Sequence, residues 1–446
     1  MKKVAFRNLG CKVNEYEMEY MQQVMTKNGY KIVPFDTIAD IYVINTCTVT
    51  NIADRKSRQM LHKAKKLNPN AIVVATGCYA QTDTDGAYND PAVDIIVGNN
   101  KKAELPNIIE EYIDSKQIKK MEVIDVASAY EYEDMHITHT QEHTRAFIKI
   151  QDGCEQFCSY CAIPLARGRV RSRSLENILS EVKDLALNGY KEVVITGIHL
   201  SSYGVDFHQK ENGQIPKYNE LNKDNAYTNE DLLNVIKNVA LIDGIKRIRL
   251  GSLEPRLITD KFVEEISKID KICPHFHLSL QSGCDETLKR MNRQYTCSEY
   301  LNGVRLLRNG FNNPAITTDV IVGFPGESDE EFNITKEYLK KIRFFELHVF
   351  KYSKRKNTVA AKMKNQVPDS IKDIRSDELI NMDNIFTSDF KNSYLNKMVE
   401  VLFEEEKDGI FIGHTKEYIK VGIKTDEDLK GEIRTLMLDG ETLFFV

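Results

Sequence analysis

Three cysteines, Cys154, Cys158 and Cys161, lie close together near the middle of the chain and are called here the central trio. Cysteine thiolate is the usual ligand of iron–sulfur clusters, and three thiolates in one loop can hold three irons of a [4Fe–4S] cube. The fourth iron is then open to a substrate. A closed zinc site would need a fourth Cys or His nearby, and none follows within the loop. The spacing therefore predicts an iron–sulfur cluster with one open iron.

A second set of three cysteines, the amino-terminal trio, is dispersed along the sequence but shares one feature. Cys11 follows VAFRNLG, Cys47 follows IYVINT and Cys78 follows IVVATG, so each comes after an apolar segment typical of a strand. The carboxyl ends of parallel strands converge on one crevice of an open α/β sheet. We therefore expect these thiols to meet and bind a second cluster, although any one of them alone could be a buried free thiol.

The chemistry of nine cysteines in 446 residues depends on the compartment. The first twenty residues lack the continuous apolar segment of a secretory signal, and no apolar run approaches the roughly 18 residues of a membrane helix. We therefore expect a cytoplasmic protein without a membrane partner, in which disulfides are disfavoured. The remaining Cys273, Cys284 and Cys297 show no regular spacing, and we expect ordinary packed or exposed thiols.

The amino-terminal trio requires a sheet of parallel strands to bring it together. Residues 1–115 alternate apolar strands with helices, which predicts a doubly wound α/β domain. Helices are expected over Glu15–Asn28 and Ile52–Leu67. Residues 116–144 are polar and lack a period, so they predict a linker. The predicted strands are Lys3–Asn8, Ile41–Asn45, Ile72–Thr76 and Val93–Val97.

The central trio directly follows the first strand of a longer alternating region, residues 145–367. Six strands alternate with helices there, which predicts a partial (β/α)6 barrel, short of the usual eight strands. Barrel enzymes act at the carboxyl ends of their strands, where the central trio would lie. A polar, irregular stretch at 204–229 is expected to be a surface insertion. The predicted strands are Ala146–Ile150, Glu192–Thr196, Lys246–Leu250, His275–Leu280, Ala315–Val322 and Glu346–Phe350.

Residues 368–446 predict a connecting helix followed by a small β-barrel. Its five short strands are separated by tight turns. They are expected at Met398–Phe403, Ile410–Thr415, Tyr418–Ile423, Gly431–Met437 and Thr442–Val446.

Positive charge is concentrated in three acid-free runs, although the net charge is −5. Residues 55–66 and 351–364 each hold six Lys or Arg, and arginines alternate from Arg167 to Arg173. Such runs are either solvated faces or binding sites for a polyanion, so an RNA partner is a reasonable hypothesis.

Several sequence motifs resemble those of the radical S-adenosylmethionine (SAM) methylthiotransferase family. IQDGCEQFCSYCAIPLARGRVRSRS resembles the family's cluster loop, and GCKVNEYE, NTCTVTNIADRKSRQ and ATGCYAQ resemble the motifs of its amino-terminal domain. LSLQSGCDETLKRMNRQYT and DVIVGFPGESDEEF resemble its later barrel motifs, and the last ~70 residues resemble its RNA-binding TRAM domain. The resemblance covers nearly the whole chain.

The resemblance implies two [4Fe–4S] clusters and SAM as cofactors. The cluster on the central trio would bind SAM and yield a 5′-deoxyadenosyl radical. The family's target, C2 of adenine, carries a hydrogen too weakly acidic for a side-chain base, so homolytic abstraction is the workable route. The cluster on the amino-terminal trio would carry the sulfur, which a first SAM methylates before transfer.

The matched motifs also suggest residues that contact SAM. Each has an alternative structural role in packing, in a turn or at a strand end. These candidates are Tyr160, Gly197, Gln281, Arg293, Asp319 and Gly323.

The resemblance implies the anticodon stem-loop of tRNA as substrate, a flavodoxin or ferredoxin as reductant, and a monomer. Lys12-Val13 after the first cysteine favours the branch that acts on N6-threonylcarbamoyladenosine over the one that acts on N6-isopentenyladenosine, which typically has Gln-Met. An arginine between 167 and 173 could bind the threonylcarbamoyl carboxylate or an RNA phosphate. A ribosomal protein substrate, or a non-catalytic iron–sulfur RNA-binding protein, are the alternatives.

Overall fold

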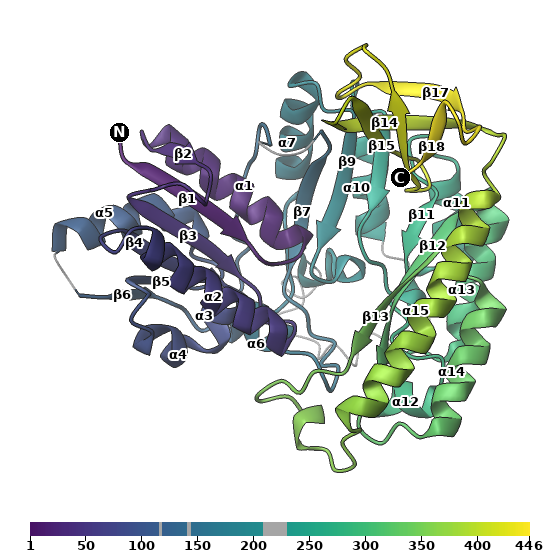
Figure 1. The fold of residues 1–446 in the computed structure, drawn as a ribbon, viewed down its shortest axis with the longest axis horizontal. Coiled ribbons are helices and arrows are strands. Elements are labelled where there is room, and N and C mark those ends of the chain that lie inside the picture. The colour runs from purple at the N-terminus through teal and green to yellow at the C-terminus, as the bar shows by residue number, and fades with distance from the viewer. Residues whose placement is uncertain (116–117, 141–143, 208–229) are drawn as a thin grey trace.

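The computed structural model of the chain describes residues 1–115, 118–140, 144–207 and 230–446. Figure 1 shows an amino-terminal α/β domain on one side, a central barrel, and a small β-sheet beyond the last long helix. The insertion predicted at 204–229 lies, from residue 208 onward, outside the described residues.

The amino-terminal domain is a six-stranded parallel sheet in the order β2-β1-β3-β4-β5-β6. Helices α1 and α5 cover one face and α2, α3 and α4 the other, and each face has its own apolar core. The prediction of a doubly wound domain is confirmed. The strands are β1 Lys3–Asn8, β2 Lys31–Val33, β3 Ile41–Thr46, β4 Ile72–Gly77, β5 Ile95–Val97 and β6 Lys120–Glu122. The helices are α1 Lys12–Lys27, α2 Asn51–Leu67, α3 Cys78–Thr82, α4 Thr84–Asn89 and α5 Leu105–Ser115.

The strands β1, β3 and β4 lie next to one another and end at the same edge. All six residues of β3 are buried, as expected for a strand covered on both faces. Asn8 is in register with Asn45, and Asn45 with Thr76. The chain leaves each strand toward the same crevice, at the point where the strand order reverses between β1 and β3.

Strand β6 lies within residues 116–144, which the sequence predicts to be a linker. It pairs with β5 in parallel and forms one edge of the sheet. Its three residues are Lys-Met-Glu, and so short and polar an edge strand carries no apolar alternation by which to recognise it.

The barrel consists of six parallel strands in chain order, which confirms the predicted partial barrel. One sheet has the order β10-β9-β7-β8 and the other β11-β12-β13, and the bridges Ile248–Ile272 and Leu253–Leu278 join them. The strands are β7 Ala146–Asp152, β8 Arg171–Ser172, β9 Glu192–Gly197, β10 Arg247–Leu250, β11 His275–His277, β12 Ala315–Val322 and β13 Glu346–Lys351. The helices are α6 Ile163–Arg167, α7 Leu175–Leu187, α10 Glu230–Ala240, α11 Asp260–Ser267, α12 Asp285–Arg290, α13 Cys297–Gly310 and α14 Asp329–Ile342.

Alternation along β11, β12 and β13 decides which side chains face the barrel interior. Phe276 and Val320 belong to the core beneath the outer helices, and so does Leu347. Their neighbours His277, Asp319 and His348 therefore point inward.

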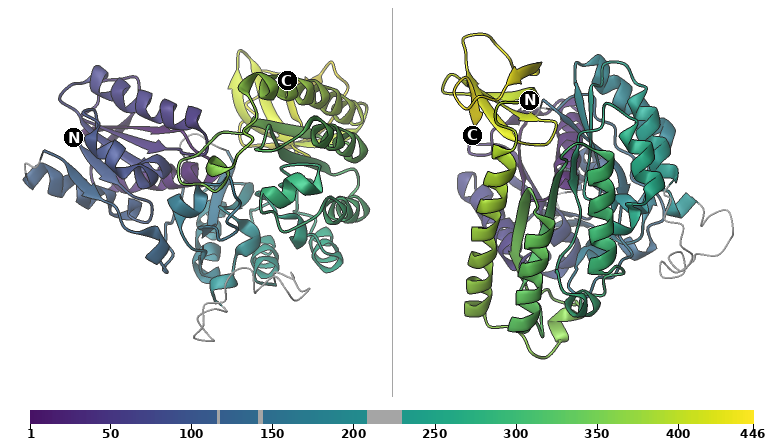
Figure 2. Two further views of the ribbon diagram at one scale, coloured as in Figure 1. Left: turned by 90° about the horizontal axis from the view of Figure 1, so that it is seen from below. Right: turned by 90° about the vertical axis from the view of Figure 1, so that its right-hand side faces the viewer.

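The carboxyl-terminal region begins with the 24-residue helix α15, Asp369–Asn392, which packs along β13. A five-stranded antiparallel sheet follows in the order β17-β14-β15-β16-β18. All five predicted strands are present, and they form a half-barrel with β17 and β18 at its edges. Figure 2 shows this sheet at one end of α15. The strands are β14 Met398–Lys407, β15 Ile410–Thr415, β16 Lys420–Lys424, β17 Ile433–Met437 and β18 Leu443–Phe445.

The half-barrel is docked by two arginines of β10. Arg247 Nη1 donates to the carbonyl of His414 at 3.0 Å, and Arg249 Nη1 donates to the carbonyl of Lys416 at 3.0 Å. Because β10 begins at Arg247, this contact lies at the amino-terminal end of the barrel strands. In the described part of the chain no helix, α15 included, is apolar enough over a sufficient length to cross a membrane.

Candidate active site

The central trio lies in the loop between β7 and α6. Gly153 (φ +75°) starts the loop, and a Cβ there would lie 1.7 Å from the carbonyl oxygen of Arg169, so only glycine fits. Ser159 Oγ donates to the carbonyl of Arg290 at 2.8 Å, and Ser159 N donates to that of Met291 at 3.0 Å. These bonds fix the loop to the segment after α12, on the other sheet of the barrel.

The thiols of the central trio influence one another. Burial raises the pKa of Cys154, and the neighbouring Cys158 and Cys161 raise it further. Burial likewise raises the pKa of Cys161 to about 12, with Cys158 as the next cause. Such thiols stay protonated near neutral pH until a metal replaces the proton. Arg293 Nη1 donates to Cys158 Sγ at 3.1 Å, which supplies positive charge to a thiolate.

The amino-terminal trio meets at the crevice of the six-stranded sheet. Cys11 directly precedes α1, Cys47 follows β3, and Cys78 is the first residue of α3. Burial raises the pKa of Cys47 to about 12, and the thiols of Cys78 and Cys11 are further causes. Gly77 has φ +90°, and a Cβ there would lie 2.5 Å from the carbonyl oxygen of Thr46.

Three asparagines support this trio, and the sequence analysis did not identify them. Cys11 Sγ donates to Asn14 Oδ1 at 3.6 Å, and Asn99 Nδ2 lies 3.8 Å from Cys78 Sγ. Asn14 Nδ2 donates in turn to Asn45 Oδ1 at 3.2 Å. Only their positions in the sequence could have indicated these residues. Asn45 lies near the end of β3, shortly before Cys47, and Asn14 lies in the first turn of α1, shortly after Cys11.

The two trios also lie near each other. Asn99 Nδ2 donates to the carbonyl of Ala166 at 2.7 Å, and α3 packs against α6. Cys78 is among the causes that raise the pKa of Cys161. The two cysteine sets therefore border one site between the domains.

The thiols of the two trios are not grouped tightly enough to surround a single zinc ion. Four-coordinate zinc with Zn–S bonds of about 2.3 Å brings its sulfurs to within about 4 Å of one another. In the described residues no three cysteine sulfurs all approach within 4.8 Å. An iron–sulfur cube, with metal and sulfide between the thiolates, needs that wider spacing. The residues therefore fit the cluster that the spacing predicted.

The other three cysteines do not join either trio. Arg249 lies beside Cys273, while Cys284 lies beside Cys297 at the start of α13.

Three of the four arginines that follow the central trio are buried and bound within the protein, which leaves Arg169 as the member of this run that could contact a substrate. Arg167, Arg171 and Arg173 are fully buried. Arg167 Nη2 donates to Asn14 Oδ1 at 2.8 Å, and Arg173 Nε donates to Asp134 Oδ1 at 2.6 Å. Of this run only Arg169 is partly exposed.

Arg167 belongs to a buried charge network that joins the two domains. Glu17 of α1 pairs with Arg167, with Lys102, and with Lys149 of β7 at 2.8 Å. Lys149 also pairs with Asp152 at 2.7 Å. Burial alone would raise the pKa of Glu17, but the three cations hold it well below its usual range. The network fixes α1, and with it Cys11, against the first barrel strand.

The structure brings some of the predicted SAM contacts together. Gln281 has φ +72°, and its backbone N–H donates to the carbonyl of Asp319 at 2.9 Å. Arg293 contacts Cys158, and its guanidinium lies 4.8 Å from the ring centroid of Tyr295.

Each of the remaining predicted contacts, Tyr160, Gly197 and Gly323, has a close structural neighbour of its own. The ring of Tyr160 packs edge-on against Phe324, with centroids 6.3 Å apart. Gly197 ends β9, and a Cβ there would lie 2.9 Å from Gln151 Oε1. Gly323 has φ +70°, and a Cβ would meet Lys372 of α15, so its backbone requires glycine irrespective of any cofactor.

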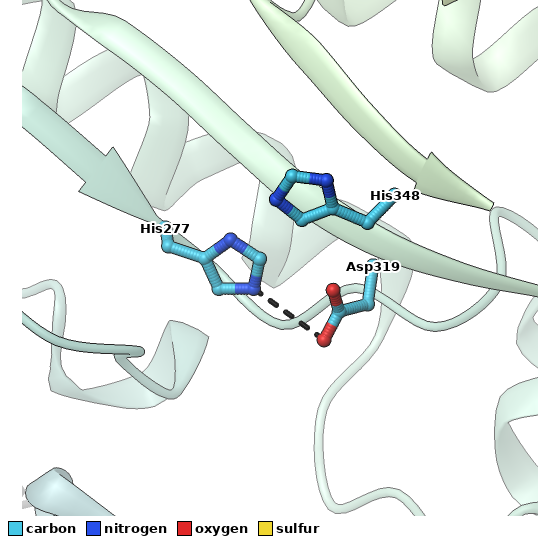
Figure 3. A group of neighbouring side chains, drawn as sticks. All are labelled: His277, Asp319 and His348. Carbon is cyan, nitrogen blue, oxygen red and sulfur yellow. Dashed lines mark ion pairs between the residues drawn. The ribbon is translucent and has the colours of Figure 1, made fainter. Parts of the chain in front are cut away.

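Asp319 lies in a cluster with two histidines that the sequence analysis did not identify (Figure 3). His277 Nε2 lies 3.5 Å from Asp319 Oδ2, and the rings of His277 and His348 are stacked with centroids 5.5 Å apart. Burial would raise the pKa of Asp319, but a hydrogen bond from His277 and the charges of both histidines lower it. All three residues occupy inward-facing positions of neighbouring strands. Their proximity could be predicted only from the register of β11, β12 and β13, which the sequence does not give.

Lys12 lies at the start of α1, directly after Cys11 of the amino-terminal trio. Cys11 and Lys12 are exposed to solvent, yet burial is the largest effect on both pKa values, raising that of Cys11 and lowering that of Lys12 to about 8. Burial lowers the pKa of His275 well below its usual range, and the charges of Arg249, Lys12 and His277 lower it further.

Comparison with known proteins agrees with this geometry. Residues 3–98 match a family described as uncharacterized protein family UPF0004, and residues 148–339 match the radical SAM superfamily. The Bacillus subtilis protein named threonylcarbamoyladenosine tRNA methylthiotransferase MtaB is 40% identical over 97% of this chain and 93% of its own length. The Thermotoga maritima protein of the same name is 36% identical over 99% and 96%. A Pelotomaculum thermopropionicum tRNA-2-methylthio-N(6)-dimethylallyladenosine synthase is 33% identical over 99% and 96%.

Solved structures agree in fold. The radical S-adenosylmethionine methyltransferase TsrM from Kitasatospora setae is 12% identical, with a TM-score of 0.53 over 78% of this chain and 73% of that one. On these findings the chain belongs to the radical SAM methylthiotransferase family, whose members carry SAM and two [4Fe–4S] clusters. Within that family the relatives with the highest identity quoted above bear the threonylcarbamoyladenosine name.

Proposed function

We propose that this chain methylthiolates C2 of N6-threonylcarbamoyladenosine at position 37 of tRNA, giving 2-methylthio-N6-threonylcarbamoyladenosine. One observation carries the proposal: relatives of that name are 36–41% identical over 91–99% of the chain. We place the reaction in the cytoplasm, where tRNA and a reductant such as flavodoxin or ferredoxin are available to a monomeric enzyme.

The two trios divide the chemistry between them. When bound, the clusters and SAM supply a 5′-deoxyadenosyl radical at the central trio and a sulfur atom at the amino-terminal trio. The chain's own residues hold these two centres at one interface, through the contacts of Asn99 and the network of Glu17. A base between them can lose hydrogen to one side and accept sulfur from the other.

The residues around the central trio have proposed roles in SAM binding. Arg293 contacts Cys158 and stabilises negative charge on its sulfur. We assign the polar contacts with SAM to Gln281 and Asp319. Tyr160, Gly197 and Gly323 are assigned the packing and close backbone approach that the cofactor requires.

The basic runs support an RNA partner. The run at 351–364 packs against the start of α2, which carries the run at 55–66: Asn51 N donates to Ser353 Oγ at 3.1 Å. Arg355 forms an ion pair with Asp54 at 2.6 Å in this contact, whereas Arg55 and Lys356 are exposed to solvent. The two runs therefore join into one basic surface beside the site. We propose that this surface and the half-barrel hold the anticodon stem-loop, whose unpaired base can be extruded toward the two trios.

The second candidate is the same reaction on N6-isopentenyladenosine, because relatives of that kind are 32–34% identical. An isopentenyl group needs an apolar pocket, whereas the residue next to Cys11 of the amino-terminal trio is Lys12, a cation that favours a carboxylate. Mass spectrometry of tRNA nucleosides from cells with and without the gene tests the choice. Loss of 2-methylthio-N6-threonylcarbamoyladenosine supports the proposal, and loss of the isopentenyl product instead refutes it.

A further inference from the structure

A cavity beside the cluster loop has no role in the reaction described so far. Its volume is about 300 Å³, and Cys158 and Cys161 of the central trio belong to its wall. Among the described residues that line it there is no member of the amino-terminal trio and none of the six candidates for contact with SAM. The cavity therefore reaches the central trio from a side other than the one assigned to the cofactor and the base.

Large apolar side chains are exposed around this cavity, which is called here the apolar cup. Phe157 is 60% exposed, Leu165 47% and Val359 63%, and all three line the cup. They come from three different segments, namely the cluster loop, the short helix α6 and the stretch that follows β13. Exposed apolar side chains that gather in this way commonly mark a surface where another protein binds.

Phe157 is held in an unfavourable backbone conformation. Its φ is +48°, in the left-handed region that a residue with a bulky side chain rarely adopts. Asn292 Nδ2 donates to the carbonyl of Phe157 at 3.0 Å and so helps to fix this conformation. Strain of this kind concentrates at functional sites. Because the ring of Phe157 is largely exposed, packing within this chain does not account for it, and a bound partner would.

The rim of the apolar cup carries positive charge. Arg169 lines the cup and is 35% exposed. Lys354 and Lys356 are exposed in the segment that leads to Val359. Glu155, an acid in the lining, faces Arg169 at 3.5 Å. A partner with an acidic surface around an apolar centre would therefore complement the cup in both charge and polarity.

The two cysteines in the wall indicate what such a partner would do. The chemistry proposed at the central trio needs one electron for each SAM that is cleaved, and electron transfer slows steeply with distance. A donor seated in the cup would lie directly against ligands of that cluster. A flavin is flat and aromatic with an apolar dimethylbenzene edge, which suits an apolar cavity with a phenylalanine at its mouth. An iron–sulfur carrier presents backbone and sulfur instead, which this lining complements less well.

We propose that the apolar cup is the docking site for an acidic, flavin-carrying protein of the flavodoxin type, with the apolar edge of the flavin against Phe157 and Leu165. This inference rests on the proposed function and assigns its electron donor to a surface of the chain. One electron leaves the reduced flavin anion, which becomes the neutral radical, and reduces the cluster on the central trio. No bond forms or breaks, and no proton crosses the interface.

The test compares two reductants on the reconstituted holoenzyme with SAM and without RNA. Dithionite is a small ion that needs no docking site, whereas reduced flavodoxin does. Phe157→Asn removes the ring but keeps a residue that tolerates the left-handed conformation. We expect the dissociation constant for flavodoxin, measured by titration calorimetry, to rise about tenfold, as for an aromatic residue at the centre of an interface. With limiting flavodoxin, 5′-deoxyadenosine formation should slow by the same factor, while the rate with dithionite stays within about twofold of that of the unaltered enzyme.

Further variants separate docking from damage to the cluster loop. Leu165→Gln, on α6 rather than in the loop, should weaken flavodoxin binding in the same way, and Phe157→Tyr should keep most of the affinity. The control Leu187→Gln, exposed on α7, should change neither quantity. Flavodoxin affinity of the unaltered enzyme should fall as salt rises, because contacts between acidic and basic surfaces are screened.

Unchanged flavodoxin affinity in both Phe157→Asn and Leu165→Gln would overturn the proposal. Equal losses of rate with flavodoxin and with dithionite in both variants would overturn it too. If the variants weaken only tRNA binding, or only the binding of a ferredoxin, the cup serves another partner and the proposal fails. Neither flavodoxin binding nor 5′-deoxyadenosine formation from SAM requires tRNA. A failure of the threonylcarbamoyl assignment would therefore leave both results standing, and a failure of docking would leave the tRNA product obtained with dithionite unchanged.

Discussion

At the scale of single residues, the contact between Arg293 and Cys158 links a predicted cofactor residue directly to a cluster ligand. The guanidinium donates to the sulfur at 3.1 Å, and on a cluster held by Cys158 this bond would withdraw electron density from the thiolate and favour the reduced state. Arg293→Met removes this bond, which is worth about 1.5–3 kcal/mol by analogy with other charged hydrogen bonds. We expect the rate of 5′-deoxyadenosine formation to fall about tenfold or more, with the iron content unchanged.

The measurement is a quantified assay of 5′-deoxyadenosine with dithionite as reductant, together with the electron paramagnetic resonance spectrum of the reduced cluster. Arg305→Met, at an exposed position of α13, is the matched control. A variant that keeps both its rate and its spectrum would show that Arg293 serves only packing against Tyr295.

Some of these residues could be predicted from the sequence and others could not. The six cysteines proposed as cluster ligands were selected by loop spacing and by their places after apolar strands. His277 and His348 carry no local signal, because their relation to Asp319 depends on the register of three strands. The arginines after the central trio illustrate the opposite error: a charged run suggests solvent exposure, but Arg167 and Arg173 are buried against Glu17 and Glu181.

At the scale of elements, β10 anchors the half-barrel through arginines rather than through an apolar interface. Arg247 Nη2 donates to the carbonyl of Glu400 at 2.5 Å, and its Nε donates to the carboxylate of the same residue at 2.9 Å. Arg247→Met removes these bonds and leaves buried acceptors unsatisfied, at a cost of about 3 kcal/mol. We expect amide hydrogen exchange in β14 and β15 to accelerate about a hundredfold and tRNA affinity to fall.

Formation of 5′-deoxyadenosine should change less than twofold in Arg247→Met, because the central trio lies at the other end of the barrel strands. Arg434→Met, whose partner Glu427 lies on the surface, is the control. Unaltered exchange in β14 would contradict an anchoring role for Arg247.

The elements themselves are largely predictable, with consistent exceptions. Strands such as β3 and β4 are recognisable because they are buried on both faces and therefore form continuous apolar runs. The strands β2, β6 and β8 were not predicted. Each has two or three residues and includes Lys or Arg, so neither apolar run nor alternation identifies it.

At the scale of the whole molecule, the account requires two separate clusters held at one interface. We expect about eight irons per chain after anaerobic reconstitution, since each trio supplies ligands for one four-iron cube. Alanine at all three positions of the central trio should leave about four irons and abolish 5′-deoxyadenosine formation. Alanine at all three positions of the amino-terminal trio should also leave about four irons, but preserve 5′-deoxyadenosine formation and abolish methylthio transfer.

A triple alanine variant of Cys273, Cys284 and Cys297 is the matched control and should keep all eight irons. If the variant of the amino-terminal trio kept all eight irons, the second cluster would have to be assigned to Cys273, Cys284 and Cys297 instead.

The central claim is that one enzyme joins radical chemistry at one trio to sulfur transfer at the other, on a threonylcarbamoylated adenosine. The most direct test incubates the reconstituted enzyme, SAM and a reductant with an equal mixture of two tRNAs, one bearing N6-threonylcarbamoyladenosine and one N6-isopentenyladenosine, followed by mass spectrometry of the digested nucleosides. The account predicts 2-methylthio-N6-threonylcarbamoyladenosine as the methylthiolated product, with at least tenfold less of the isopentenyl product. Methylthiolation of the isopentenyl tRNA alone would contradict it.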